Sequence, residues 1–141
     1  MEQARTPEAD AQRIRIRRSG ELLAAQARVA RSVPERMVGL LGRASLPPGE
    51  ALIFPECQSI HTWGMRFPID VIVTDRLWRV VALQPRLPPW RIMAPVRSGW
   101  GIIEMAEGSI QRAGLEVGDQ LELQEMPGPA PSPDQAPCSS T

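Results

Sequence analysis

The feature that most constrains the fold of this chain is a change of pattern after residue 50. Six short apolar runs follow one another from there, and clusters of Pro, Gly, Asp or Arg separate them: ALIFP, SIHTWGM, FPIDVIVTD, LWRVVAL, GIIEM and DQLELQ. Short runs with turn signals at roughly 8- to 12-residue intervals are typical of β-sandwiches and barrels. The sequence therefore predicts a mainly β fold, an antiparallel sandwich or barrel-like sheet, with one or two short α-helices.

The regions around these runs predict a hairpin and two short helices. Ile14 and Ile16 alternate with Arg, and a Ser-Gly turn leads into a returning strand over residues 21–29. The segment SVPERMVGLLGR, residues 32–43, has the Ser-x-x-Glu spacing of a capping box and predicts a helix. The segment EGSIQRAG, residues 107–114, predicts one or two helical turns that end at its last glycine.

Length and composition indicate one folded domain with polar ends. The chain has 141 residues, 43% of them hydrophobic, and a net charge of zero, so its charge draws it neither to nucleic acid nor to an anionic membrane. We expect residues 1–12 to be disordered, residues 13–124 to form the β-rich domain, and residues 125–141 to be a flexible Pro/Ser-rich tail. No secretory signal or spanning segment is visible, so a cytoplasmic location is expected, with Cys57 and Cys138 as free thiols.

The stretch CQSIHTWGMRFPID, residues 57–70, holds side chains that could carry chemistry. It contains the only histidine of the chain, His61, between Cys57 and Asp70. In a straight strand Cys57 and His61 lie about 13 Å apart, at a rise of roughly 3.3 Å per residue, and only a bend near Ser59 would join them. A buried thiol and a hydrogen-bonded ring are therefore favoured over a catalytic or metal-binding pair. If the protein is an enzyme, the candidate catalytic residues are His61, Asp70 and Cys57.

Two carboxylates interrupt apolar strands and need an explanation. Asp70 costs several kcal/mol in such a strand unless it is paired or hydrogen-bonded. Its expected partners are Arg43, Arg66 or His61, or else backbone N–H groups. Glu104 lies between two apolar residues, either on the solvent face of an edge strand or linked to an Arg. If the two carboxylates are neighbours, they could hold a cation or divide acid and base roles.

Four tryptophans lie at or near strand ends and loops: Trp63, Trp78, Trp90 and Trp100. Trp90 stands between Pro and Arg in a proline-rich loop. A loop aromatic beside Arg is typical of a contact surface, although the ring could equally fold back onto the sheet as a lid.

Three stretches together resemble the family called domain of unknown function 192, also uncharacterised protein family 0127, of bacteria, archaea and plants. The matching positions cover about residues 27–123 and are Arg36, Gly39, Leu40, Leu41, Arg43, Pro68, Ile69, Asp70, Glu104, Gly108, Gly114, Gly118 and Asp119. The resemblance implies a mainly β fold of sandwich type with short helices, and no established activity. His61 stands where many members have Trp, so members can do without this ring.

These observations favour a non-catalytic module that binds a small molecule or a protein partner. The expected polar pocket is built from Arg43, Arg66, Asp70 and Glu104, and His61 and Trp63 complete the predicted ligand-binding residues. The first alternative is a small hydrolase or metal-dependent enzyme that uses His61 and Asp70.

The second alternative is nucleic-acid binding through the Arg13–Arg18 stretch, which the zero net charge disfavours. A phosphate loop, a nucleophile elbow, a CxxC pair and an HExxH helix are all missing from the sequence. The missing motifs favour a protein without catalysis but leave that question open, and we expect no cofactor, no metal site, no nucleic-acid partner and no membrane segment.

Overall fold

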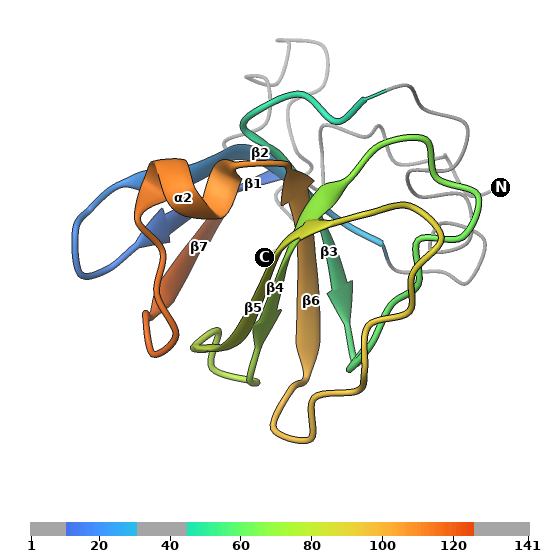
Figure 1. Cartoon of the computed structure of the whole chain (residues 1–141). Helices are drawn as coiled ribbons and strands as arrows, with labels where there is room; N and C mark the ends of the chain where they lie inside the picture. Colours follow the sequence, from blue (N-terminus) through green and yellow to red (C-terminus); the bar gives the residue numbers. More distant parts are fainter. Residues whose placement is uncertain (1–10, 31–44, 126–141) are drawn as a thin grey trace, which may run out of the picture.

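The computed structural model describes residues 11–30 and 45–125. The helix expected over residues 32–43, together with Arg43 and Cys138, lies outside these ranges. In chain order the elements are β1 (Ala11–Ile16), β2 (Leu22–Val29), β3 (Glu50–Pro55), β4 (Ile69–Thr74), β5 (Val80–Leu87), β6 (Gly101–Ala106), α2 (Ser109–Ala113) and β7 (Leu121–Glu125) (Figure 1).

All seven strands belong to one sheet in the order β5-β4-β6-β3-β2-β1-β7. Neighbouring strands form six pairs. The pair β2–β3 is parallel, and the other five pairs are antiparallel. The sheet curls so strongly that its two edge strands meet where each begins. There, an isolated bridge joins Arg79 to Gln120, and the Leu121 N–H donates to the Trp78 carbonyl at 2.9 Å. We call this contact the seam; it turns the curled sheet into a half-barrel.

The concave side of the half-barrel holds the inner cluster. Alternation in β1 sends Ile14 and Ile16 inward, both fully buried, while Arg15 between them is exposed. Strands β4 and β6 add Ile72 and Ile103 to the same side. The inner cluster comprises Ile14, Ile16, Leu23, Ala24, Ala27, Ala51, Ile53, Ile72, Val80, Ile103, Met105, Ile110, Leu115 and Leu121.

The convex side of β3, β4 and β6 is also buried, and we call its apolar residues the outer cluster. They are Ala30, Leu46, Leu52, Phe54, Met65, Ile69, Val71, Val73, Leu87, Met93 and Ile102. Because apolar residues cover both faces, every residue of β4 and of β6 is buried. This explains why these two strands are nearly continuous apolar runs in the sequence.

The helix α2 closes one end of the half-barrel, as Figure 1 shows. Its residue Ile110, and Leu115 just after it, belong to the inner cluster. Gly114 ends the helix in the left-handed conformation, with φ of 65°, and its N–H donates to the Gln111 carbonyl. The predicted turn of helix and its glycine cap are both present.

The predicted mainly β fold class is confirmed, and the barrel-like alternative describes the sheet better than the sandwich. The sheet is mixed, because β2 and β3 run in parallel, whereas a wholly antiparallel one was expected. The hairpin of β1 and β2 is present as predicted. Within residues 11–30 and 45–125, no helix has the length and apolar character that crossing a membrane requires.

Candidate functional site

Two long loops, residues 56–68 and 88–100, lie against each other beside the convex face of the sheet. Backbone hydrogen bonds join them at regular intervals: Thr62 N–H to Arg91 C=O (2.8 Å), Met93 N–H to Ile60 C=O (2.9 Å), and Val96 N–H to Gln58 C=O (3.1 Å). We call this pair the double loop. Met65 and Met93 point from it into the outer cluster, so it covers that cluster and is held by it.

Thr62 is the residue that ties the double loop together. It is fully buried, and its hydroxyl donates to the Pro88 carbonyl (2.6 Å) and accepts from the Arg91 N–H (3.0 Å). Its carbonyl also accepts from the N–H groups of Trp90 (3.0 Å) and Met65 (3.2 Å). A buried side chain with this many satisfied partners fixes the positions of the residues on either side of it.

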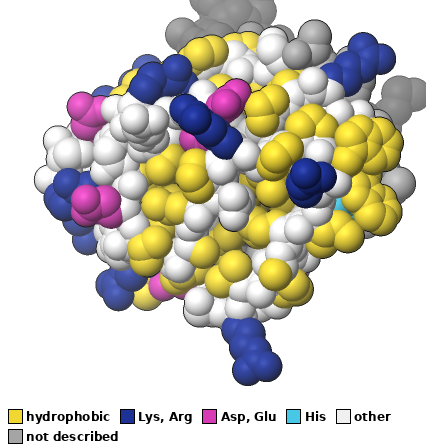
Figure 2. Space-filling model, viewed as in Figure 1, with side chains coloured by type: hydrophobic (Ala, Val, Ile, Leu, Met, Phe, Trp, Pro, Cys, Tyr) yellow, Lys and Arg dark blue, Asp and Glu magenta, His cyan; other side chains and the backbone are white. Residues whose placement is uncertain are grey.

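The outward side of the double loop carries an exposed hydrophobic surface. Trp63 is 51% exposed, and Trp90 and Ile92 are each 65% exposed. The His61 ring lies 5.5 Å from the Trp63 ring, centroid to centroid, and His61 forms a β-bridge with Ile92. We call these four residues the aromatic surface. Figure 2 shows hydrophobic side chains gathered around the single histidine at this side of the molecule.

Trp90 is held in an unusual backbone conformation. Its φ is 63°, in the left-handed region that a bulky side chain rarely adopts. Strain of this kind persists only where the surroundings impose it, and it concentrates at functional sites. Here the bond from the Trp90 N–H to Thr62 imposes the conformation. The exposed ring excludes the lid alternative and favours the contact-surface alternative for Trp90.

Exposed arginines flank the aromatic surface. Arg66 and Arg91 are both exposed, and neither forms an ion pair with another described residue. Exposed Trp beside Arg is the composition that distinguishes the centres of protein interfaces from the rest of a protein surface.

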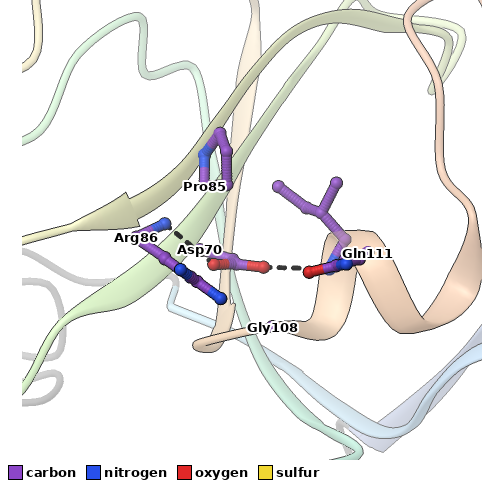
Figure 3. Close-up of a pocket in the computed structure, with 6 residues that line it drawn as sticks. Asp70, Pro85, Arg86, Gly108 and Gln111 are labelled. Carbon is purple, nitrogen blue, oxygen red and sulfur yellow. Dashed lines mark hydrogen bonds between the residues drawn. The ribbon is translucent and has the colours of Figure 1, made fainter.

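Asp70 lies on the concave face of β4 and receives two backbone hydrogen bonds. One carboxylate oxygen accepts from the Arg86 N–H (3.0 Å), and the other accepts from the Ile110 N–H (2.9 Å) in the first turn of α2. Figure 3 shows the carboxylate between β5 and this helix. The backbone alternative foreseen for Asp70 therefore describes it, and none of Arg66, His61 or another described side chain bonds to it.

A pocket of 460 Å³ opens beside this carboxylate. Its described lining consists of Asp70, Pro85, Arg86, Gly108, Ile110 and Gln111 (Figure 3). Each oxygen of Asp70 already has a donor, and the Arg86 guanidinium lies 3.5 Å from Glu107. These contacts hold α2 and β5 against β4, so the residues around this pocket stabilise the fold.

Glu104 lies on the opposite face of the sheet. It stands opposite Val71 in the β4–β6 pairing, whereas Asp70 stands opposite Met105, so the two carboxylates point to different sides. Glu104 is 6% exposed, and no described residue donates a hydrogen bond to it. Burial raises its pKa to about 8. It is neither on an edge strand nor linked to an Arg of the described ranges, contrary to both expectations.

The predicted site residues that the structure describes therefore do not gather in one place. A cation shared by Asp70 and Glu104 is excluded by the sheet between them. The Cys57 thiol donates to the Ser59 carbonyl (3.0 Å), and His61 is exposed on the aromatic surface. No hydrogen bond among the described residues joins Cys57, His61 and Asp70 to one another. Across the described part of the chain, His, Cys, Asp and Glu nowhere form a group of three that could hold a metal ion.

The strand predicted over SIHTWGM is wrong. Only His61 forms a bridge there, and the Met65 N–H turns back to the Thr62 carbonyl through Gly64, whose φ is 81°. Trp63 and Met65 consequently face opposite ways instead of sharing a strand face. Sequence reasoning also missed Thr62 and Ile92. A small polar residue flanked by His and Trp was the one signal that could have indicated Thr62.

The chain matches the family model described as "DUF192: Uncharacterized ACR" over residues 14–123. It is 35% identical over 113 residues to a UPF0127 protein of Pyrococcus furiosus, and the match covers 76% of this chain and 94% of the relative. These similarities extend the resemblance seen in the sequence across nearly all of the described residues.

Two crystal structures have a similar fold. One is "a putative transcription regulator" from Sinorhizobium meliloti 1021, with a TM-score of 0.70 and 20% identity, covering 80% of this chain and 93% of that one. The other is a protein of unknown function from Novosphingobium aromaticivorans DSM 12444, with a TM-score of 0.68 and 18% identity, covering 86% and 99%. At these identities the likeness is one of fold.

Proposed function

Because the chain belongs to the DUF192/UPF0127 family of uncharacterised proteins, its function has to be argued from its own surface, and we propose that it is a non-catalytic binding module. The aromatic surface of the double loop holds a protein partner. The observation that carries this proposal is the exposure of Trp63, Trp90 and Ile92 on loops that are themselves firmly hydrogen-bonded.

The rigidity of the double loop supports binding without rearrangement. Thr62 fixes both loops from inside, and Met65 and Met93 anchor them in the outer cluster. A surface that is already ordered loses little conformational entropy when a partner docks. Trp side chains on such a surface contribute a large share of binding energy where they occur at interface centres.

The partner expected here has an apolar centre and an acidic border. Trp63, Trp90 and Ile92 would fill apolar hollows of that partner, while Arg66 and Arg91 face its carboxylates. The hydrolase alternative has no comparable support, since His61 and Asp70 lie on different sides of the sheet and each has its own contacts.

Affinity capture with matched variants tests the proposal. The full chain is compared with Trp63→Ala/Trp90→Ala and with Leu77→Ala/Val117→Ala, in which two other exposed apolar residues are removed. The captured partner is then purified and its affinity measured directly. We expect the tryptophan variant to bind at least roughly thirtyfold more weakly, as for loss of about 2 kcal/mol at an interface centre.

The control variant distinguishes specific binding at the aromatic surface from non-specific binding of any exposed apolar residue. It should bind like the natural chain, because Leu77 and Val117 lie at the turns beside the seam and are not part of the aromatic surface. Equal affinity of the tryptophan variant and the natural chain for every purified partner would overturn the proposal. So would an equal loss of binding in both double variants.

A further inference from the structure

A second pocket opens at the end of the half-barrel opposite α2. Its volume is 520 Å³, and its described lining is Gln12, Val29, Ile53, Pro55, Glu56, Trp78, Trp100 and Leu123. Ile53 belongs to the inner cluster, and Val29, Trp78 and Leu123 pack against that cluster. The pocket is therefore the mouth of the barrel interior, separate from the aromatic surface. We call it the mouth pocket.

Two tryptophans form perpendicular walls of the mouth pocket. The rings of Trp78 and Trp100 lie 5.6 Å apart, centroid to centroid, with an angle of 84° between their planes. In such a pair the edge of one ring meets the face of the other, and the faces of both rings border the corner between their planes. The face of an indole carries negative electrostatic potential and attracts a cation placed over it.

The backbone holds both tryptophans in place on each side. The Trp100 N–H donates to the Thr74 carbonyl (2.7 Å), and the Trp100 carbonyl accepts from the Cys57 N–H (2.8 Å). The Trp78 carbonyl accepts from Leu121 across the seam, and its N–H donates to the Asp75 carbonyl (3.1 Å). Both rings are thus ordered before any ligand arrives, which lowers the entropic cost of binding.

Backbone strain also concentrates at this pocket. Trp78 and Glu56 have φ values of 63° and 55°, so two of the four non-glycine residues described with positive φ line it. The turn at Asp75 imposes the conformation on Trp78, because the Asp75 carboxylate accepts from the N–H groups of Leu77 and Arg79, both at 2.9 Å. Observed strain of this kind is associated with ligand sites.

The described lining of the mouth pocket carries one negative charge. Glu56 is the one ionisable group among its described lining residues, and it is exposed. No Arg is among these residues, although the chain has 16 basic residues in all. A carboxylate beside two indole rings, with apolar walls behind them, matches a ligand that carries a positive charge on an apolar body.

We propose that the mouth pocket binds a small organic cation of the alkylammonium or quaternary ammonium class. The cationic head lies in the corner between Trp78 and Trp100, with Glu56 as its counter-charge. The apolar part extends toward Val29, Ile53 and Leu123. The Gln12 amide at the rim can accept a hydrogen bond from a hydroxyl or ammonium group of the ligand.

The test compares a cation with a neutral molecule of the same shape. Choline carries a positively charged quaternary nitrogen. In 3,3-dimethylbutan-1-ol a carbon atom takes the place of this nitrogen, so the molecule has the same shape and no charge. Both are titrated into the full chain by calorimetry and by ligand-observed NMR. We expect choline to bind at least about tenfold more tightly, which corresponds to cation–π attraction at a partly desolvated site. Equal binding of the two molecules, or no binding of choline, would overturn the proposal.

Two variants locate the binding. Glu56→Gln keeps the shape of an exposed side chain and should weaken choline binding severalfold without changing the weak binding of the neutral isostere. Trp100→Leu should abolish the preference for the cation. Trp63→Leu is the matched control, because it removes a tryptophan from the aromatic surface and leaves the mouth pocket intact. Choline affinity that is unchanged in Glu56→Gln and Trp100→Leu, or lost in Trp63→Leu, contradicts the assignment.

Discussion

Asp70 and Glu104 are two buried carboxyl groups on neighbouring strands, and their environments are opposite. Asp70 faces the inner cluster near the start of β4, where the N–H groups of Ile110 and Arg86 donate to it. Glu104 faces the outer cluster in the middle of the sheet. Its neighbours on the flanking strands are the apolar residues Leu52 and Val71. Both are nearly inaccessible to water, yet among the described residues only Asp70 has hydrogen-bond donors.

The comparison teaches that strand position decides how a buried acid is stabilised. Inside a sheet the strand ladders already use the backbone N–H groups, so a carboxyl group there finds no donor. At a strand end, α2 and the irregular end of β5 still have N–H groups to donate. Asp70 thus contributes to the fold through its two backbone hydrogen bonds, whereas Glu104 is tolerated with its pKa raised to about 8 by burial.

The largest expected effect on stability is that of removing the Asp70 carboxyl group. Asp70→Ala leaves the N–H groups of Arg86 and Ile110 buried without an acceptor, and we expect a loss of about 3–5 kcal/mol in the free energy of unfolding. Asp70→Asn keeps one acceptor oxygen and should lose less. Denaturant titration of the purified variants measures both. A loss below about 1 kcal/mol for Asp70→Ala would mean that the two bonds do not secure α2.

The next effect is the pH dependence that Glu104 introduces. Its pKa is about 8 in the folded protein and 4.5 as the ordinary value. Between these values the unfolded chain releases the proton and the folded chain keeps it, so the free energy of unfolding falls as pH rises from about 4.5 to about 8. We expect the total loss to be on the order of a few kcal/mol.

Glu104→Gln isolates this contribution. The variant should match the natural chain near pH 5 and exceed it in stability above pH 8, since the amide does not ionise. Unfolding by denaturant across that pH range gives the difference curve. A difference that stays constant with pH would show that Glu104 is already ionised in the folded protein.

A smaller effect sharpens the contrast between the two faces of the sheet. A Cβ at Gly99 would lie 2.6 Å from Cγ1 of Val73 on the outer face, whereas a Cβ at Gly101 would lie no closer than 3.3 Å to Thr74 on the inner face. We expect Gly99→Ala to cost about 1–3 kcal/mol by overpacking. Gly101→Ala should cost less. Thermal unfolding of both variants ranks them, and the reverse order would mean that the double loop adjusts more easily than the barrel interior.

The smallest effect concerns a third carboxyl group, that of Asp119, which is buried but is bonded to a half-exposed arginine. The Arg18 guanidinium donates two hydrogen bonds to Asp119, at 2.8 and 3.0 Å, and lowers the pKa of that carboxyl group. Arg18 is half-exposed, so water and salt screen this pair. We expect Arg18→Gln to shift the unfolding midpoint least of these variants, and less still in high salt. A shift as large as that of Asp70→Ala would mean that a half-exposed partner stabilises a buried carboxyl group as much as buried backbone donors do.

Much of the fold could be predicted because local rules determine it. The alternation of Ile14 and Ile16, followed by a Ser-Gly turn, was sufficient for the β1–β2 hairpin. Gly114 marked the end of α2. An aspartate within an apolar strand implied a buried acceptor, and backbone N–H groups were among its foreseen donors.

The candidate site was harder to predict because its contacts join distant residues. Thr62 forms hydrogen bonds with residues more than twenty positions away in the sequence. No periodic pattern in the sequence indicates hydrogen bonds of this kind between two loops. The burial of Glu104 could not be predicted either, because a carboxylate in a strand ordinarily indicates a solvent-exposed face. In this protein apolar residues cover both faces of β6. The run SIHTWGM, residues 59–65, looked like a strand, although it belongs to one half of the double loop.

The seam has a further consequence, for aggregation. Among the described residues, β5 and β7 touch only where they begin, and no described strand pairs with the remaining outer edge of either, so another chain could add there. Pro85 interrupts the β5 edge, and Arg86 beside it has a φ of 52°, so the line of backbone donors there is broken. Exposed Glu122 and Glu125 place charge along β7. Both edges thus discourage strand addition, and we expect the protein to remain free of cross-β assembly at high concentration.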